Sequence, residues 1–244
     1  MVPERFAVHL GTHIVSKYAH IHKAFVEIEQ LCWSRIVVGK DCKPHRHSFF
    51  RDGDEKRIVK VEIDGTTGKN KIQARVSAGV NDLLVLKSSG SSFSSSIRDE
   101  YSLLKEVDDR FSTSVDQNYT FAPISISLLK DEDKLVIIIP ALDKAKAGSV
   151  GDATVLDRAR TITLKVFAED ESASVQATLY KMGQRIIAEN AGVQSVSYAL
   201  PNKHYIPVNM TLYGDNLTPA KAEVFQPVAA SSGLISATVS RVYV

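Results

Sequence analysis

Cysteine and long hydrophobic runs are scarce in this sequence. Cys32 and Cys42 are the two cysteines among 244 residues, which is too few for a disulfide scaffold and fits buried or idle thiols in a reducing compartment. The longest aliphatic run, residues 135–139, is far shorter than the roughly 18 residues that a membrane-spanning helix needs. The first residues carry no basic segment followed by an apolar stretch, so we expect no secretory signal.

Charge of one sign is lacking as well. Thirty Lys and Arg residues against 28 Asp and Glu residues leave a formal net charge of +2, which is too small to hold a phosphate backbone or an anionic membrane by electrostatics alone. We therefore expect neither a nucleic-acid nor a membrane partner. The chain does have 44% hydrophobic and 24% charged residues, which suits a soluble protein with a sizeable core in one large or two small domains.

Hydrophobic periodicity predicts several strands. Apolar and polar residues alternate with a period of two in these segments. The phase of the alternation slips near Leu31 and Trp33, which is typical of a β-bulge. The Gly, Thr and Asn content of residues 65–70 predicts a hairpin turn. The region of residues 130–151 is expected to form a hairpin excursion or a long loop. Strands are predicted at or within residues 26–33, 59–64, 72–77, 83–86, 119–121, 161–170, 196–200, 224–228 and 234–239.

Helical spacing predicts three helices. The first runs to about Lys17, with an apolar stripe of Phe6, Leu10, Ile14 and Tyr18. The second covers residues 99–110, after a serine-rich linker at residues 88–96. The third has the clearest pattern, a stripe of Val175, Leu179, Met182 and Ile186 that Ser172 or Ser174 caps and Asn190 or Gly192 ends. Together the elements favour an α+β fold with helices on one face of antiparallel sheet.

Motifs for common catalytic chemistry are missing. The sequence has no Gly-x-Ser-x-Gly elbow, no dinucleotide-binding glycine pattern and no catalytic cysteine signature. Two His-x-His pairs, His20 with His22 and His45 with His47, are compatible with a zinc or copper site. They lack a third ligand at a recognised spacing, so we favour strand-end residues over a metal site.

Several stretches, in one order and across nearly the whole chain, resemble urate oxidase (uricase). They are residues 11–22 (GTHIVSKYAHIH), 43–49 (KPHRHSF), 84–88 (LVLKS) with 98–101 (RDEY), 173–182 (ASVQATLYKM) and 200–205 (LPNKHY). The resemblance implies oxidation of urate by O2 and water to 5-hydroxyisourate and H2O2 in purine catabolism, with no metal and no organic cofactor. It also implies two tandem tunnelling-fold (T-fold) units, residues 1–80 and 81–244, and a homotetramer around a central tunnel with active sites at subunit interfaces.

The same resemblance assigns substrate-binding residues. Phe93, which lies 17 positions before Arg110, would stack on the planar purine. Arg110 would hold the urate anion through its planar fork, and Gln176 would pair with the opposite amide edge. Val175 would contribute backbone and packing, and Leu104 would pack beside the ring.

The resemblance also assigns two catalytic residues. Asn202 and His204 correspond to residues that border the O2 and water site, with His204 in a proton relay, a role that suits an imidazole near pH 7. Relative to the family, the chain as given lacks the first pair of strands, which supplies a catalytic Lys and Thr, so its own activity is an open expectation. Ser96 stands where the family usually has an aromatic residue.

Two alternatives to a urate oxidase follow from these departures. One is a non-catalytic, truncated urate oxidase paralogue that keeps the purine clamp. The other is a pterin- or purine-converting relative, which would be expected to carry a carboxylate where this chain has Gln176. Kinship implies a peroxisomal location, whereas the sequence ends without the Ser-Lys-Leu-type tripeptide, so a cytoplasmic location stays open.

Overall fold

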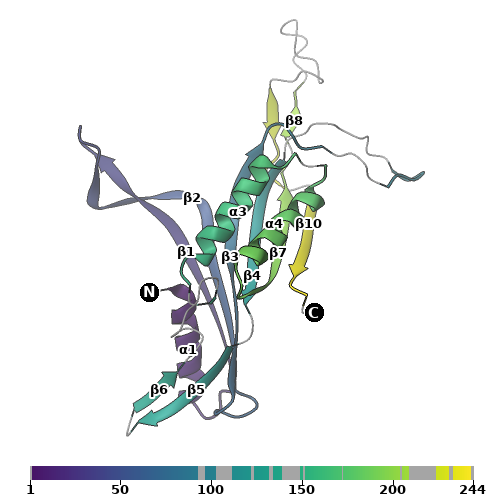
Figure 1. Ribbon diagram of the computed structural model, residues 1–244. Helices are drawn as coiled ribbons and strands as arrows, with labels where there is room; N and C mark the ends of the chain where they lie inside the picture. Colours follow the sequence, from purple (N-terminus) through teal and green to yellow (C-terminus); the bar gives the residue numbers. More distant parts are fainter. Residues whose placement is uncertain are drawn as a thin grey trace, which may run out of the picture.

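The computed structural model describes residues 2–92, 97–102, 112–121, 124–131, 134–138, 149–150, 152–171, 173–203, 205–208, 224–230 and 233–242. Its helices and strands follow one another in separate runs, as in an α+β arrangement (Figure 1). Their bounds are α1 Pro3–Lys17, β1 Lys23–Val38, β2 Lys43–Asp64, β3 Ile72–Lys87, β4 Ser112–Phe121, β5 Ile124–Asp131, β6 Lys134–Ile138, α3 Val155–Glu169, α4 Val175–Glu189, β7 Val193–Asn202, β8 Tyr205–Pro207, β9 Phe225–Pro227 and β10 Gly233–Ser240.

One antiparallel sheet organises the described residues. Its strand order is β1-β2-β3-β4-β7-β10, with β5 added beside β3 and β6 beside β5, while β8 and β9 form a separate pair. The helices α1, α3 and α4 all contribute side chains to a single buried core against this sheet, so the predicted α+β class is confirmed. Strand β3 runs through the predicted boundary at residues 80 and 81, and the division into two units stays a prediction.

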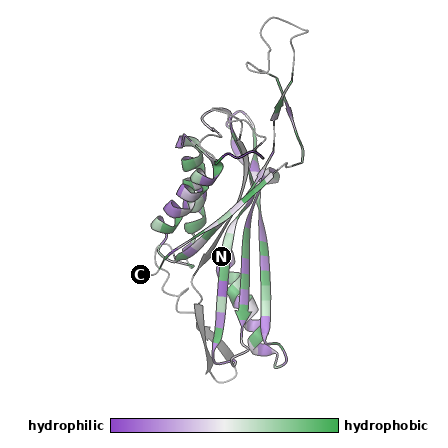
Figure 2. Cartoon of the chain, turned by 90° about the vertical axis from the view of Figure 1, so that its right-hand side faces the viewer, coloured by the Kyte–Doolittle hydropathy of each residue, from purple (hydrophilic) through white to green (hydrophobic). Residues whose placement is uncertain are grey.

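Strands β1, β2 and β3 show the alternation that the sequence predicts (Figure 2). Along β3, Ile72, Ala74 and Val76 are buried while the residues between them are more exposed. The expected β-bulge is confirmed, because the register of β1 against β2 shifts between Leu31 and Trp33.

Helix α1 was predicted correctly, but the predicted apolar stripe is not the face that is buried against the sheet. Phe6 and Leu10 are 46% and 39% exposed, whereas the small residues Ala7, Val8 and Val15 are fully buried. The reason is close packing: a Cβ on Gly11 would lie 2.7 Å from Ile63 Cγ1. Small side chains let the helix approach the sheet, so the larger ones are left outside.

The strand predicted at residues 161–170 is wrong, because this segment lies in α3. The alternation of Ile162, Leu164 and Val166 hid a helical pattern. The residues buried against the sheet recur at three- and four-residue spacing, as a helix face requires: Val155, Leu156, Ala159, Ile162, Thr163 and Val166. The hydroxyl groups of Thr163 and Tyr198 lie 2.8 Å apart and join α3 to β7 within the core.

Helix α4 agrees with the prediction at both ends. Ser174 is its N-cap, and its side chain accepts a hydrogen bond from the Ala177 backbone N–H, while Asn190 is the C-cap residue. The predicted stripe packs inward through Leu179, Met182 and Ile186, which are buried. Next in the chain, β7 follows with Tyr198 and other alternate residues buried.

Several smaller predictions are settled by the described residues. The turn at residues 65–70 joins β2 to β3. Residues 124–131 and 134–138 form a hairpin that overlaps only the start of the region expected as a hairpin excursion or long loop, and residues 139–148 lie outside the described residues. Residues 83–86 are no separate buried strand: they extend β3, and Leu84 is 60% exposed. Residues 99–102 form a turn closed by Ser102 N–H and Asp99 C=O rather than the start of a helix. The rest of that predicted helix lies outside the described residues.

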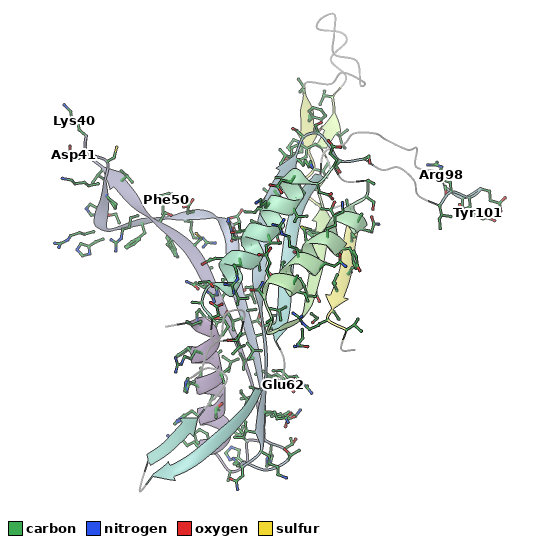
Figure 3. The ribbon with its side chains drawn as sticks, viewed as in Figure 1. Lys40, Asp41, Phe50, Glu62, Arg98 and Tyr101 are labelled. Carbon is green, nitrogen blue, oxygen red and sulfur yellow. The ribbon has the colours of Figure 1, made fainter. Side chains whose placement is uncertain are left out.

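Residues 31–38 of β1 and residues 43–56 of β2 form a two-stranded ribbon, the β1–β2 ribbon, that projects from the body (Figures 1 and 3). Large apolar side chains on this ribbon are exposed: Leu31, Trp33, Ile36, Val37, Val38, Phe49 and Phe50. Both cysteines lie there too, exposed rather than buried. None of the described helices is long and apolar enough to cross a membrane.

Candidate functional site

The predicted site residues differ in how the structure treats them. Phe93, Leu104, Arg110 and His204 lie outside the described residues. Val175 and Gln176 are described in full, and the backbone of Asn202 is described as the last residue of β7.

Val175 and Gln176 are the first two residues of α4. Val175 is half-buried and the Gln176 side chain is exposed, so it is open to a ligand. Ser174 caps the next N–H group, that of Ala177, and no described residue accepts from the N–H groups of Val175 and Gln176. These two donors therefore stand at the positive end of the helix dipole, where an anion is favoured by about 0.3–1 kcal/mol.

The course of the chain brings Asn202 to the same end of the molecule. α4 has 15 residues and is therefore about 22 Å long at 1.5 Å per residue. After a short turn, β7 runs back along it and advances about 3.3 Å per residue, so it needs about seven residues to reach the level of Val175. Asn202 is the tenth residue of β7 and lies about 10 Å beyond that level at about 3.3 Å per residue, paired with Gly233 of β10.

Strands β3 and β4 reach this end as well. Lys87, the last residue of β3, pairs with Ser112, the first residue of β4. Ser92 is the described residue next in sequence to Phe93, and Ser112 is the one nearest to Arg110. The described segments next to Phe93 and Arg110 therefore leave the sheet where α3 ends and α4 begins (Figure 1).

Two charged residues beside α4 were missed from the sequence. Lys87 donates to backbone carbonyls at the end of α3, including that of Asp170 at 2.5 Å. The Asp170 carboxylate accepts from Thr178 Oγ1 at 2.8 Å and from Lys181 Nζ. Burial raises the pKa of Asp170, but the hydrogen bonds from Lys181 and Thr178 outweigh it, so the pKa is lowered overall. The contacts of Lys87 span about 80 positions, so no local pattern could have revealed them.

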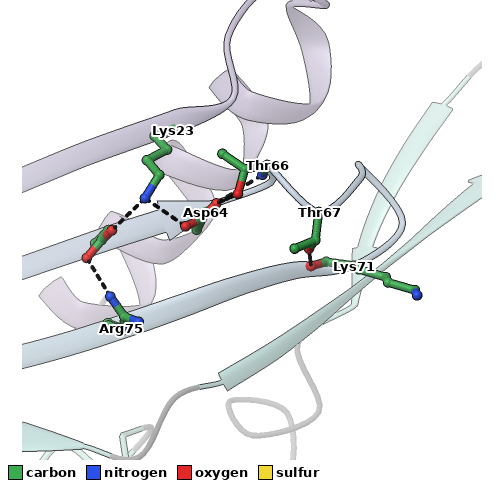
Figure 4. Close-up of polar contacts among 7 residues, drawn as sticks. Lys23, Asp64, Thr66, Thr67, Lys71 and Arg75 are labelled. Atoms are coloured by element: carbon green, nitrogen blue, oxygen red, sulfur yellow. Dashed lines mark hydrogen bonds and ion pairs between the residues drawn. The ribbon is translucent and has the colours of Figure 1, made fainter.

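A second polar cluster lies on the open face of the sheet, near the turn between β2 and β3 (Figure 4). Lys23 pairs with Glu62 at 3.4 Å and with Asp64 at 2.8 Å, and Arg75 pairs with Glu62 at 3.3 Å. Hydrogen bonds to Asp64 and Glu62 raise the pKa of Lys23, and hydrogen bonds from Lys23 and Thr66 lower that of Asp64. Both shifts favour the charged forms, and each charge is matched by another, so the cluster acts as an ion-pair network that joins three strands.

The histidine pairs show no metal geometry. Within the part of the chain that the structure describes, no group of three or more His, Cys, Asp or Glu side chains could hold a metal ion. His45 Nδ1 instead accepts the backbone N–H of His47 at 3.3 Å on the exposed ribbon.

The fold and this end of the sheet define an α+β protein in which the N-terminus of α4 presents an exposed Gln176. The family model described as Uricase matches residues 6–62 and 76–236. The chain is 41% identical over 241 residues to the uricases of Emericella nidulans and Aspergillus flavus, covering 98% of this chain and 73% and 72% of those proteins. Its structure resembles the crystal structure of the uricase from Arthrobacter globiformis with a TM-score of 0.73 and 28% identity, over 98% of this chain and 70% of that one.

These matches extend over nearly all of the chain at substantial identity. The chain belongs to the uricase family.

Proposed function

We propose that this chain is a urate oxidase, which converts urate, O2 and water to 5-hydroxyisourate and H2O2 in purine catabolism. The observation that carries the proposal is the first turn of α4, where the exposed Gln176 amide and two backbone donors face outward at the end of the sheet, in a chain of the uricase family. Urate is a planar anion with amide edges, which such donors and acceptors can bind.

In this proposal the purine is held from two sides. Arg110 donates two parallel hydrogen bonds to the urate anion, and Gln176 pairs with the opposite amide edge. Phe93 stacks on the ring, Leu104 packs at its border, and Val175 offers its backbone N–H. Binding at the α4 N-terminus also favours the anionic form of the substrate.

Asn202 and His204 are assigned to O2, water and protons. Their position at and just after the end of β7 supports the assignment, because β7 ends at the same end of the molecule at which α4 begins. His204 accepts the proton that the substrate loses and donates a proton to the peroxide. Asn202 orients O2 or water. The balance is one urate, one O2 and one H2O consumed for one 5-hydroxyisourate and one H2O2 formed.

We propose that the reaction needs no metal and no organic cofactor, as the family resemblance implies. Activity should then survive dialysis against a chelator, and loss of activity with rescue by a metal would contradict this part of the proposal.

We further propose a homotetramer with active sites at subunit interfaces. The exposed β1–β2 ribbon supports this, because an isolated two-stranded ribbon with large apolar side chains is marginally stable in water unless it packs against something. Strands β1 and β10 also form the two ends of the strand order among the described residues, and sheet edges of this kind favour strand pairing between chains. Sedimentation should give about four times the chain mass of 26.8 kDa, and a monomer at assay concentrations would contradict the tetramer.

A peroxisomal location is part of the proposal by kinship. A fluorescent fusion that leaves the C-terminus free should co-localise with a peroxisomal marker, and diffuse fluorescence would favour the cytoplasm instead.

The sharpest test of the substrate site substitutes Gln176. We expect Gln176→Ala to lower kcat/KM for urate by about 10- to 100-fold, because an unpaired amide edge costs about 1–3 kcal/mol. Gln184→Ala is the matched control, since Gln184 lies two turns further along α4, is exposed, and donates to Tyr180 Oη at 2.8 Å. Equal effects of the two substitutions would remove Gln176 from the site.

A further inference from the structure

Lys87 caps the C-terminal end of α3. Its ammonium donates to the carbonyl oxygens of Phe167 at 3.3 Å, Ala168 at 3.5 Å and Asp170 at 2.5 Å. The last carbonyls of a helix have no partner within the helix and form the negative end of its dipole. A single ammonium from the end of β3 therefore anchors the end of α3 to the sheet.

The chain after β3 folds over this lysine. Gly90 has a positive φ of 77°, and a Cβ there would lie 3.2 Å from Lys87 Cε. Ser91 is 2% exposed, so the segment is packed rather than free. Lys87 is half-buried, and its ammonium is held by the carbonyls at the end of α3, which favours a fixed position over a freely moving surface side chain.

Asp170 extends the connection from α3 to α4. It is the C-cap residue of α3, and its side chain is 13% exposed. Its carboxylate accepts from Thr178 Oγ1 at 2.8 Å and from Lys181 Nζ, both on the first two turns of α4. The path from the sheet to α4 therefore runs from Lys87 through the backbone of Asp170 to its carboxylate and on to Thr178.

This path ends beside the substrate site. Thr178 lies two positions after Gln176 in the first turn of α4. Thr178 is 6% exposed and faces the core, whereas Gln176 is exposed. Fixing Thr178 therefore fixes the height and rotation of the turn that presents Gln176 and Val175.

We propose that Lys87, acting through Asp170, is a positioning residue for urate binding, because it sets the first turn of α4 relative to the sheet. The proposal rests on the proposed function, since it takes Gln176 as a substrate-binding residue. Lys87 itself does not touch the substrate in this account. A misplacement of binding groups by about 1 Å can cost about 100-fold in rate, so one anchor is enough to matter.

The test combines two measurements on the full chain. Lys87→Met keeps the length of the side chain and removes the ammonium. Lys165→Met is the matched control on α3, because Lys165 is 54% exposed and its nearest partner, Glu169, lies 4.0 Å away. Urate affinity is measured without O2, and amide hydrogen exchange is measured for the peptide of residues 168–178.

We expect Lys87→Met to weaken urate binding by about 10-fold when Gln176 is present and by less than about 2-fold in a Gln176→Ala background, as residues that act through one another are not additive. Exchange of residues 168–178 should become about 10-fold faster in Lys87→Met and stay unchanged in Lys165→Met, because the substitution frees that segment locally.

A merely structural role would lower the melting temperature and weaken binding equally in both backgrounds, which would overturn the proposal. Unchanged exchange of residues 168–178 would also overturn it, whatever the ligand does. If the unsubstituted chain binds no urate, the proposed function fails, and exchange still decides whether Lys87 positions α4.

Discussion

Replacing Glu4 by Gln should destabilise the protein far more than is usual for a charged residue near the N-terminus, because Glu4 is buried. Glu4 lies in the first turn of α1, and its carboxylate accepts two hydrogen bonds from Arg57 of β2, at 2.7 and 2.8 Å. The side chains of Glu4 and Arg57 are 4% and 17% exposed. The pair is thus a buried clamp between α1 and the sheet.

The magnitude follows from this burial. Removing one partner of a buried ion pair costs about 3–5 kcal/mol, because it leaves a buried charge without compensation. Arg57 keeps some contact with water, which lowers the cost, but its Nε is already buried without a partner among the described residues. Loss of an acidic residue from the first turn adds about 0.5 kcal/mol through the helix dipole. We expect a total of about 3 kcal/mol.

Urea denaturation followed by circular dichroism measures this effect. A loss of about 3 kcal/mol lowers the midpoint by about 1 M or more, for slopes of about 1–3 kcal/mol per M. Glu27→Gln is the control, because Glu27 and its partner Lys60 are 54% and 59% exposed and such a pair contributes about 0–1 kcal/mol. If Glu4→Gln is as mild as Glu27→Gln, burial does not make the Glu4–Arg57 pair a strong contributor to stability.

Two further predictions concern α4 and its surroundings. Gly183→Ala should lower stability by about 1–3 kcal/mol, because the new Cβ would lie 2.8 Å from Val239 Cγ2 of β10. A Cβ at Gly233 would meet nothing within 4 Å, so Gly233→Ala should be close to neutral. Thermal melts compare the two variants, and equal melting temperatures would contradict close packing at Gly183. The lowered pKa of Asp170 means that its stabilisation is present above its unfolded value near pH 3.8 and is lost as the pH falls toward the folded value. The unfolding midpoint of the unsubstituted protein should therefore fall more steeply between about pH 5 and pH 3 than that of Asp170→Asn, and parallel curves would show that Asp170 adds no such dependence.

The elements that were predicted correctly are those whose local signals agree. Helix α4 has an N-cap, an apolar stripe and a stop residue, and each of them matches the structure. The bulge in β1 was visible because the alternation itself changes phase near Leu31 and Trp33. In both cases the pattern of the segment alone determines its structure.

The errors arose where tertiary packing chose between two local patterns. Helix α1 has a stripe of large apolar residues and a face of small ones, and the sheet selects the small face because Gly11 allows close contact with Ile63. In α3, Ile162 and Val166 fit a strand and a helix equally well over a short window, and burial against the sheet selects the helix.

The candidate site came from resemblance rather than from local physics. Without it, an exposed Gln176 on a helix would be an ordinary surface residue. Lys87 carries no local signal at all, because its partners Phe167 and Asp170 are about 80 positions away and only the folded chain brings them together. The roles of Gln176, Asn202 and the other assigned residues stay predictions that the variants above can test.

Turnover of urate by this chain decides whether it is a urate oxidase. Urate loss by absorbance, O2 uptake at an electrode and H2O2 formation by a peroxidase assay would be followed in one metal-free reaction. We expect the three rates to be equal and all three to fall together in Gln176→Ala. Binding of urate without any O2 uptake would contradict catalysis and favour a paralogue that keeps only the purine clamp. If the chain neither binds urate nor takes up O2, the proposed substrate site is wrong.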